Sequence, residues 1–216
     1  MSRPLLAEFF GTLWLVMTGI GTGIMAIALS PDATALALFV NSVATGLALY
    51  VLITVFAPIS GAHLNPAVTL YMALTRQITL LTALMYGFAQ IAGGLCAVPL
   101  THAMFGEALI QIATTDRSAA RLWLSEGIAT FGLLMVIAGG LKSASPQLPA
   151  LVGSWVAAAF WFTGSSIFGN PAVTIARMFS DSFTGIRPVD APGYIVAELA
   201  AALLAFVLLP RLFGRD

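Results

Sequence analysis

The sequence predicts an all-α membrane protein in which a unit of three membrane-spanning helices and one half-membrane helix occurs twice, in opposite orientations. Hydrophobic residues make up 59% of the 216 residues and charged residues only 8%, whereas about 25% of the residues in an average soluble domain are charged. So few charges cannot cover a soluble surface. The pentapeptide Asn-Pro-Ala-Val-Thr occurs at residues 65–69 and again at 170–174, which indicates an internal duplication.

Composition also excludes several classes of protein. The formal net charge is zero and the chain has no basic tract, so nothing indicates a nucleic-acid partner. Cys96 is the only cysteine, so the chain can form no internal disulfide and no cysteine-rich zinc site. We interpret Cys96 as a small buried apolar side chain. The first apolar run is long and lacks a clear small-residue cleavage site, which favours a first membrane span over a signal peptide.

Six membrane spans are expected, at about residues 5–28, 35–57, 78–104, 121–141, 147–168 and 191–209. The thirty residues between Arg76 and Glu107 contain no acid, lysine or arginine, which is enough for the ~20 residues that cross a bilayer core. The two pentapeptides follow the second and fifth spans. The segments that begin there, about 67–76 and 172–179, are each only ~15 Å long as helices, so we expect half-membrane helices.

A second repeated pattern supports the duplication. Glu and Thr open the first and fourth spans at the same spacing, and a Tyr with a Gln or Glu four residues later recurs in the third and sixth. The residues are Glu8 and Thr12, Glu126 and Thr130, Tyr86 and Gln90, Tyr194 and Glu198. We expect one channel domain with repeats at about 1–106 and 117–216. Because three spans is an odd number, the second repeat must insert upside down.

Inversion brings the two Asn-Pro-Ala starts together near the membrane midplane. Asn is a favoured N-cap and Pro a favoured first residue of a helix. Two facing helix starts present positive partial charge, which repels cations and leaves neutral solutes unpenalised. The asparagine amides would offer hydrogen bonds to a passing solute while their oxygens turn back to the local backbone. The predicted pore centre is Asn65, Pro66, Ala67, Asn170, Pro171 and Ala172.

The distribution of basic residues predicts the orientation. With the N-terminus in the cytoplasm, the inner side carries Arg3, Arg76, Lys142, Arg211 and Arg215, and the outer side carries Arg117, Arg121, Arg177 and Arg187. Five against four agrees weakly with the positive-inside rule. We expect a multi-pass protein of the cell inner (plasma) membrane with both termini cytoplasmic.

The sequence around the first pentapeptide, Ser60-Gly61-Ala62-His63-Leu64-Asn65-Pro66-Ala67-Val68-Thr69, closely resembles the signature of the aquaporins and aquaglyceroporins, the major intrinsic proteins. The second Asn-Pro-Ala and the repeated glutamates extend the resemblance over nearly the whole chain. It implies an aquaporin-like hourglass fold in a lipid bilayer, a homotetramer with one pore per subunit, and passive conduction without a cofactor or metal. It also implies that Glu8 and Glu126 accept hydrogen bonds from the half-helix loops, and that His63 packs or hydrogen-bonds there.

One departure from the family pattern lies in the selectivity filter. Most aquaporins are similar in having Arg at the position that Val173 occupies here. Counting from the motifs places the other three filter positions at Thr45, Ala158 and Ile167. These four make a wide, mostly apolar constriction, which suits small uncharged solutes such as glycerol-like polyols with water. The Val-for-Arg pattern resembles a bacterial branch found alongside arsenic-resistance genes, which implies passage of arsenite-like metalloid hydroxides.

Arg177 lies four residues after Val173, one helical turn further along the same face. One hypothesis is that its guanidinium lines the outer vestibule and partly replaces the missing filter Arg. The alternative is that it ends a helix and pairs with Asp181, again four residues on.

Three other functions compete with a broad solute channel. A water-selective aquaporin would share the fold. A coupled secondary transporter would need an acid exposed to the pore, and Glu8, Glu126 and Glu198 are the candidates. An intramembrane enzyme would need a nucleophile with an acid and a base, and no such set occurs, so we predict neither catalytic residues nor enzymatic activity.

Overall fold

The computed structural model describes residues 1–214. Within that range it contains eight helices and no strand: α1 (Arg3–Leu29), α2 (Thr34–Ser60), α3 (Pro66–Leu74), α4 (Leu80–Phe105), α5 (Ala120–Lys142), α6 (Leu148–Phe162), α7 (Pro171–Arg177) and α8 (Ala191–Phe213). The all-α class and the order of long and half-length helices agree with the prediction.

Most helix ends lie within four residues of their predicted positions, and α6 is the exception. Helices α1, α2, α4, α5 and α8 are each long and apolar enough to cross a membrane. Helix α6 has 15 residues and ends before the predicted residue 168. The chain after it cannot remain helical because Ser166, Ile167 and Gly169 have φ angles of 60°, 35° and 58°, in the left-handed region.

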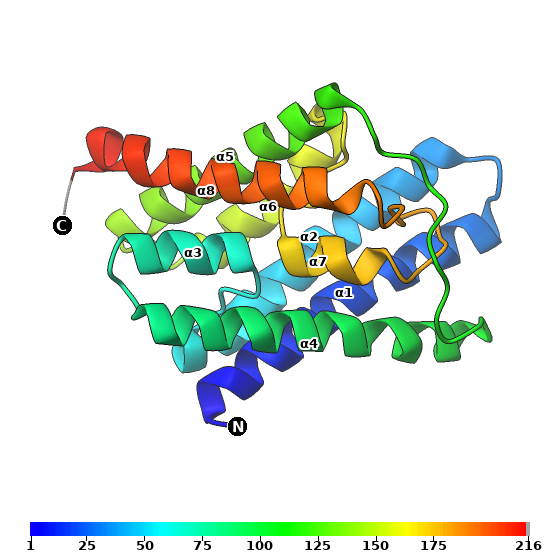
Figure 1. Cartoon of the computed structure of the whole chain (residues 1–216), viewed down its shortest axis with the longest axis horizontal. Helices are drawn as coiled ribbons and strands as arrows, with labels where there is room; N and C mark the ends of the chain where they lie inside the picture. The colour runs from blue at the N-terminus through cyan, green and yellow to red at the C-terminus, as the bar shows by residue number, and fades with distance from the viewer. Residues whose placement is uncertain (215–216) are drawn as a thin grey trace.

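Helix packing follows a two-fold correspondence between the halves of the chain. Helix α1 packs against α2 and α4, just as α5 packs against α6 and α8, and the half-helices α3 and α7 each contact both α4 and α8. Figure 1 shows α3 and α7 end to end in the middle of the molecule, with their N-terminal ends facing each other. This is the inverted arrangement that the duplicated pattern predicts.

The two halves meet closely where α2 crosses α6. A Cβ atom on Gly46 would lie 2.8 Å from the carbonyl oxygen of Gly153, and one on Gly153 would lie 2.4 Å from the carbonyl oxygen of Gly46. Neither distance is possible for a real Cβ, so only glycine allows the two backbones to approach this closely.

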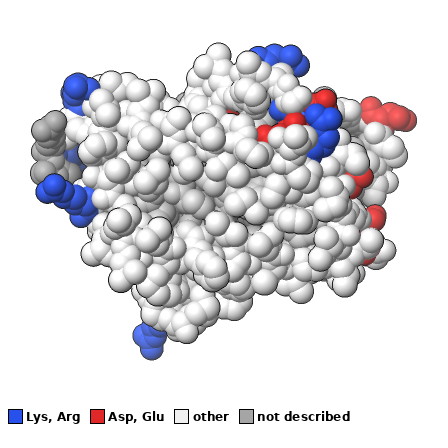
Figure 2. All heavy atoms as spheres, viewed as in Figure 1, with Lys and Arg blue, Asp and Glu red and all other residues white. Residues whose placement is uncertain are grey.

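The outer surface of the helix bundle is apolar. Large exposed side chains include Trp14, Phe88 and Trp161, and the wide middle of the surface in Figure 2 carries no charge. Such a surface matches the hydrocarbon core of a bilayer. Cys96 is also exposed, on the outer face of α4. Our expectation of a buried cysteine was therefore wrong: a small apolar residue suits a lipid-facing position as well as a core.

The charged residues separate between the two ends of the molecule. Helix α8 ends at the left of Figure 1 and α1 begins at the bottom, and among the described residues in Figure 2 the charges at the left end are basic while the acids gather toward the right. The basic residues at the terminal end are Arg3, Arg76, Lys142 and Arg211. Arg215 of the predicted inner set lies outside the described residues. We refer below to the opposite end, where α4 joins α5 and α7 joins α8, as the outer end.

Candidate pore

Each half-helix begins at an asparagine cap, as predicted. The side-chain oxygen accepts hydrogen bonds from the second and third N–H groups of the helix, at 2.8 and 3.5 Å for Asn65 and at 3.0 and 3.4 Å for Asn170. The proline that follows each asparagine has no N–H to satisfy at the first helical position. The amide oxygens thus turn back to the local backbone.

The side-chain nitrogens of the two asparagines bind across the pseudo-two-fold axis. Asn65 Nδ2 donates to the Gly169 carbonyl at 2.6 Å, and Asn170 Nδ2 donates to the Leu64 carbonyl at 2.8 Å. These bonds join the halves of the chain at the midplane. Because an amide nitrogen carries two protons, one proton on each asparagine remains for another acceptor.

The loop before α3 is held from behind by Glu8. One carboxylate oxygen accepts from the Ser60 hydroxyl at 2.6 Å and from the His63 N–H at 3.0 Å. The other accepts from the Leu64 N–H and from Gln90 Nε2, both at 2.7 Å. These contacts satisfy backbone groups that hydrocarbon would leave unpaired, which is the role the resemblance implies for Glu8.

The loop before α7 is held by two carboxylates. Glu126 accepts from both backbone N–H groups of residues 168–169, with a shortest distance of 2.7 Å. Glu198 accepts from the Asn170 N–H at 3.0 Å and from the Thr174 hydroxyl at 2.9 Å. All three intramembrane glutamates are fully buried. The structure therefore brings Glu126 to the contacts expected of it and adds Glu198.

His63 both packs and hydrogen-bonds. Its Nδ1 lies 3.1 Å from the Thr69 hydroxyl, and its ring makes an edge-to-face contact with Tyr86 at 5.4 Å between centroids. The ring also lines the central cavity. Thr69 accepts in addition from Gln90 Nε2 at 2.9 Å, so the histidine belongs to the same polar network as Glu8.

A continuous cavity passes the junction of the two half-helices. One wall is formed by the loops at residues 61–65 and 167–170, and the other by apolar side chains of α1, α2, α5 and α6. The cavity extends from Leu141 and Leu148 at the end with the termini to Arg177 at the outer end. Within the described part of the chain, no acid and no lysine lines it.

Three of the four predicted filter residues line this cavity, and one does not. Thr45, Ile167 and Val173 are buried lining residues. Ala158 is exposed on the outer face of α6, whereas Phe160 of the same helix lines the cavity. The expectation that Ala158 lines the pore was therefore wrong, and the α6 residues that line the cavity are Leu148, Val152, Val156 and Phe160. Counting from the motif failed because the chain between residues 163 and 170 is not helical.

The outer end of the cavity is formed by arginines and an aromatic ring. Arg177 is only 5% exposed, and its guanidinium carbon lies 4.4 Å from the centroid of Phe168. Asp181 is not its partner, because that carboxylate accepts from the backbone and hydroxyl groups of Thr114, both at 2.9 Å. The ion pair weighed as an alternative from the sequence is therefore absent among the described residues.

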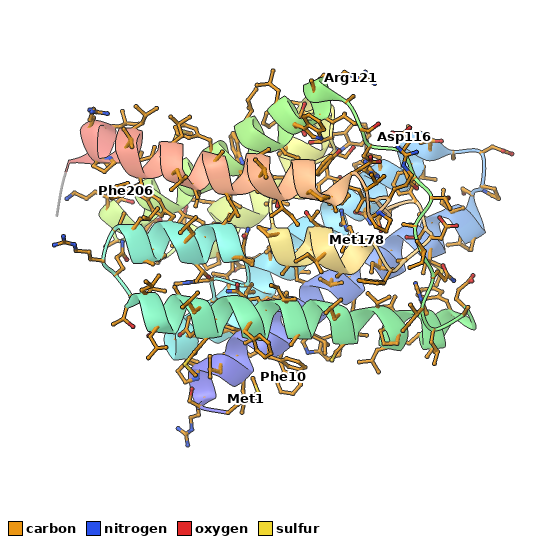
Figure 3. All side chains as sticks on the ribbon, viewed as in Figure 1. Met1, Phe10, Asp116, Arg121, Met178 and Phe206 are labelled. Atoms are coloured by element: carbon orange, nitrogen blue, oxygen red, sulfur yellow. The ribbon has the colours of Figure 1, made fainter. Side chains whose placement is uncertain are left out.

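A second arginine, Arg117, approaches the same ring. It comes from the connection between α4 and α5, and its guanidinium carbon lies 5.0 Å from the Phe168 centroid. Its Nε donates to the Gly185 carbonyl at 2.8 Å. Figure 3 labels Asp116 and Met178, the chain neighbours of Arg117 and Arg177, at this outer end.

Sequence reasoning missed Phe160 and Arg117 for different reasons. Phe160 follows Val152 and Val156 at four-residue intervals, and all three line the cavity, so a search for one helix face would have found it. Arg117 carries no such signal, because it lies in a connection whose path depends on contacts with residues 178–190.

Two oppositely oriented half-helices that meet at reciprocal asparagine contacts, inside a sheath of long apolar helices, define a membrane channel of the inverted-repeat class. The sequence model of the Major intrinsic protein family matches residues 1–167, and the chain belongs to this family, as the resemblance indicated. Aquaporins and aquaglyceroporins of this family are channels, so the protein is a multi-pass membrane channel and not an enzyme.

Individual relatives agree with that assignment. The chain is similar to Aquaglyceroporin AqpS of Rhizobium meliloti (strain 1021), with 44% identity over 209 residues that cover 97% of this chain and 89% of that protein. It is 34% identical over 186 residues to Aquaporin TIP2-1 of Arabidopsis thaliana, covering 79% of this chain and 72% of the relative. The solved structure of the aquaglyceroporin from Plasmodium falciparum matches with a TM-score of 0.73, at 19% identity over 99% of each chain, which shows a shared fold.

Proposed function

We propose that the protein is a passive channel for small uncharged solutes, including glycerol-like polyols and arsenite-like metalloid hydroxides together with water. The observation that carries the proposal is the two-sided lining of the cavity. Loop backbone and asparagine amides line one side and aliphatic and aromatic side chains the other. A polyol has the same division, with hydroxyls on one edge and C–H groups on the other.

The loops leave acceptors toward the solute. The N–H groups of residues 63, 64, 168 and 169 all donate to Glu8 or Glu126 behind the loops. The loop carbonyls that are not bound to an asparagine remain as acceptors for solute hydroxyls, and the spare asparagine protons remain as donors. A hydrated ion would exchange its water shell for these few neutral groups, so we expect ions to pass poorly.

The proposed filter consists of Thr45, Phe160, Ile167 and Val173, with Arg177 one turn further out. Val in place of Arg keeps this region wide, and the Phe160 ring supplies an apolar face for the C–H edge of a polyol. Arsenous acid is uncharged at neutral pH and similar to glycerol in size, so the same pore suits it. The name of the relative AqpS, an aquaglyceroporin, agrees with polyol passage.

Neither competing function has a comparable basis. Coupled transport requires an acid that faces the pore, but Glu8, Glu126 and Glu198 do not line the cavity. A strictly water-selective channel is the closer alternative. It would exclude glycerol by size, and the absence of an arginine at Val173 argues against such exclusion.

Stopped-flow measurements on proteoliposomes test the proposal. We expect the purified protein to accelerate entry of water, glycerol and arsenous acid down their gradients, with no dependence on a proton gradient. Passage of water alone would overturn the wide filter, and uphill uptake driven by protons would support a coupled transporter instead. Phe160→Ala should raise the permeability to five-carbon polyols by about fivefold, since removing part of a pocket wall changes discrimination by about 1 kcal/mol. Ala158→Val is the matched control on the other face of α6.

The membrane placement and assembly are proposals as well. We infer an inner-membrane protein with both termini in the cytoplasm, because the end with the termini carries Arg3, Arg76, Lys142 and Arg211 and basic residues favour the cytoplasmic side. A homotetramer with one pore per subunit follows from the family resemblance. Protease access to a C-terminal tag in sealed inverted vesicles tests the orientation, and the mass of the detergent-solubilised protein by light scattering tests the tetramer.

A further inference from the structure

A second cavity, of about 420 Å³, lies at the outer end of the pore. Its walls come from the start of α2, the α4–α5 connection, the loop before α7 and the α7–α8 connection. It shares Phe160, Phe168 and Arg177 with the central cavity. The inner wall of this outer cavity is therefore the outer end of the conduction path.

Arg177 brings an unsatisfied charge to that wall. Its side chain is 95% covered, yet within the described chain its guanidinium makes no hydrogen bond and no ion pair. The guanidinium carbon instead lies 4.4 Å from the centroid of the Phe168 ring. A guanidinium has five N–H donors, and burying them without acceptors is costly. The donors are therefore available to a molecule in the cavity.

Arg117 adds a second positive charge to the same space. It lines the outer cavity, and its guanidinium carbon lies 5.0 Å from the centroid of the Phe168 ring that Arg177 also contacts. Its hydrogen bonds go to backbone carbonyls, with the shortest to Gly185 at 2.8 Å. Carbonyl acceptors fix the side chain without cancelling its charge.

No acid balances the two arginines from within the cavity. Glu126 and Glu198 interact electrostatically with Arg177, but both are fully buried behind the α7 loop and neither lines the cavity. The remaining polar lining consists of neutral hydroxyl and amide side chains: Thr34, Asn41, Thr115, Ser166 and Thr184. A positively charged cavity rich in hydroxyls suits a small anion.

We propose that this outer vestibule is a binding site for a small planar oxyanion of single charge, such as a short carboxylate or nitrate, with Arg177 as its principal ligand. Guanidinium groups match planar oxyanions because two parallel N–H groups can bind two oxygens. Arg117 contributes the second charge from the connection between α4 and α5. A bound anion occupies the path beside Phe168 and slows solute entry, so the site makes the proposed solute channel sensitive to anions.

Nitrate is the probe, because it is planar and has no neutral form that crosses lipid at neutral pH. Glycerol flux through proteoliposomes is measured in nitrate and in gluconate at equal ionic strength. We expect nitrate, and not gluconate, to slow the flux several-fold in a saturable manner. The effect should vanish in Arg177→Gln and be reduced in Arg117→Gln, and it should persist in Arg121→Gln, an exposed outer arginine that does not line the cavity.

Two further variants keep the charge and change the geometry. Arg177→Lys retains a cation without the forked donors and should weaken the nitrate effect. A Cβ on Gly19 would lie 2.8 Å from Arg177 Nη2, so Gly19→Ala should displace the guanidinium and shift the nitrate concentration needed. If Arg177→Gln does not fold, these two variants carry the test.

The unfolding temperature of the detergent-solubilised protein gives a readout that needs no flux. A ligand that binds only the folded state raises it, so nitrate should stabilise the wild type and Arg121→Gln and not Arg177→Gln. If the wild type conducts no glycerol, the proposed function fails and this series still tests the site. Equal flux and equal unfolding temperature in nitrate and gluconate, or a full nitrate response in Arg177→Gln, would disprove the site.

Discussion

Each half of the chain contributes a half-helix unit, which consists of the half-helix, the loop before it and the residues that support that loop. The two units are alike at the asparagines where they meet and differ in the residues further from that junction. At the centre, each asparagine caps its own helix and donates to the loop of the other unit. The residue before each asparagine also has a positive φ, 51° for Leu64 and 58° for Gly169. This common geometry is what a duplicated motif requires if two helix starts are to meet in one pore.

The residues further from the junction of the two units differ in charge. The first unit is supported by one carboxylate, Glu8, and one neutral amide, Gln90, whereas the second is supported by Glu126 and Glu198. Seven residues after each asparagine, the first unit places Met72 in the cavity lining and the second places Arg177. The two units therefore share their central geometry and differ in charge at the ends of the half-helices, where only the second unit places an arginine in the cavity lining.

The largest expected effect concerns the loop supports. Glu8→Ala should lower the free energy of unfolding by about 4 kcal/mol, because four donors lose their acceptor and each buried unpaired group costs about 1–3 kcal/mol. Glu126→Ala, which frees two backbone donors, should cost less. Thermal and denaturant unfolding in detergent would measure both, with exposed Glu107→Ala as a control expected within about 0.5 kcal/mol of wild type. A larger loss of unfolding free energy in Glu126→Ala than in Glu8→Ala would contradict the idea that Glu8 satisfies more donors than Glu126.

A smaller effect should follow from restoring an arginine in the filter. Val173→Arg should reduce glycerol flux by about tenfold or more and water flux by less, because a long cation narrows the constriction and its charge must be accommodated beside Arg177; tenfold is about 1.4 kcal/mol. Val173→Leu narrows the same place without a charge and separates size from electrostatics. Stopped-flow rates for both solutes make the comparison, and unchanged glycerol flux in Val173→Arg would show that the filter lies elsewhere.

The positive φ of Gly169 predicts a still smaller change. Gly169→Ala should cost about 1–2 kcal/mol of stability, the usual penalty for a side chain in the left-handed region. It should also alter glycerol flux, since the new Cβ would lie 3.0 Å from Ile167 Cγ1. Gly106→Ala has the same penalty in open space, with φ of 72°, and should leave flux unchanged. Equal glycerol flux in Gly169→Ala and Gly106→Ala would show that Ile167 is not part of the filter.

The smallest effect is expected from mercurials. Cys96 faces outward from α4 and does not line the central cavity. Mercury(II) chloride should therefore change water flux little, and Cys96→Ser should behave as wild type in the same swelling assay. Strong inhibition that Cys96→Ser abolishes would mean that the thiol reaches the conduction path.

Several features were predictable from sequence because their causes are local. Asparagine followed by proline favours a helix start, a long apolar run without charges favours a membrane span, and an odd number of spans between two copies of a motif inverts the second copy. These rules predicted the helix order and the helix starts at Asn65 and Asn170, whereas the hydrogen bonds from the loops to Glu8 and Glu126 were expected from the family resemblance.

Other features were decided by the tertiary structure. Which α6 residue faces the pore depends on the rotation of that helix, which the Gly46–Gly153 contact and the non-helical chain after Phe162 set together. Whether Arg177 pairs with Asp181 depends on the connection between α4 and α5, because Thr114 of that connection donates two hydrogen bonds to the Asp181 carboxylate. The same connection places Arg117 against the Phe168 ring that Arg177 also contacts. Local rules determined where the half-helices begin. Long-range packing decided which side chains line the cavity, because the direction in which a side chain points depends on neighbours that are distant in sequence.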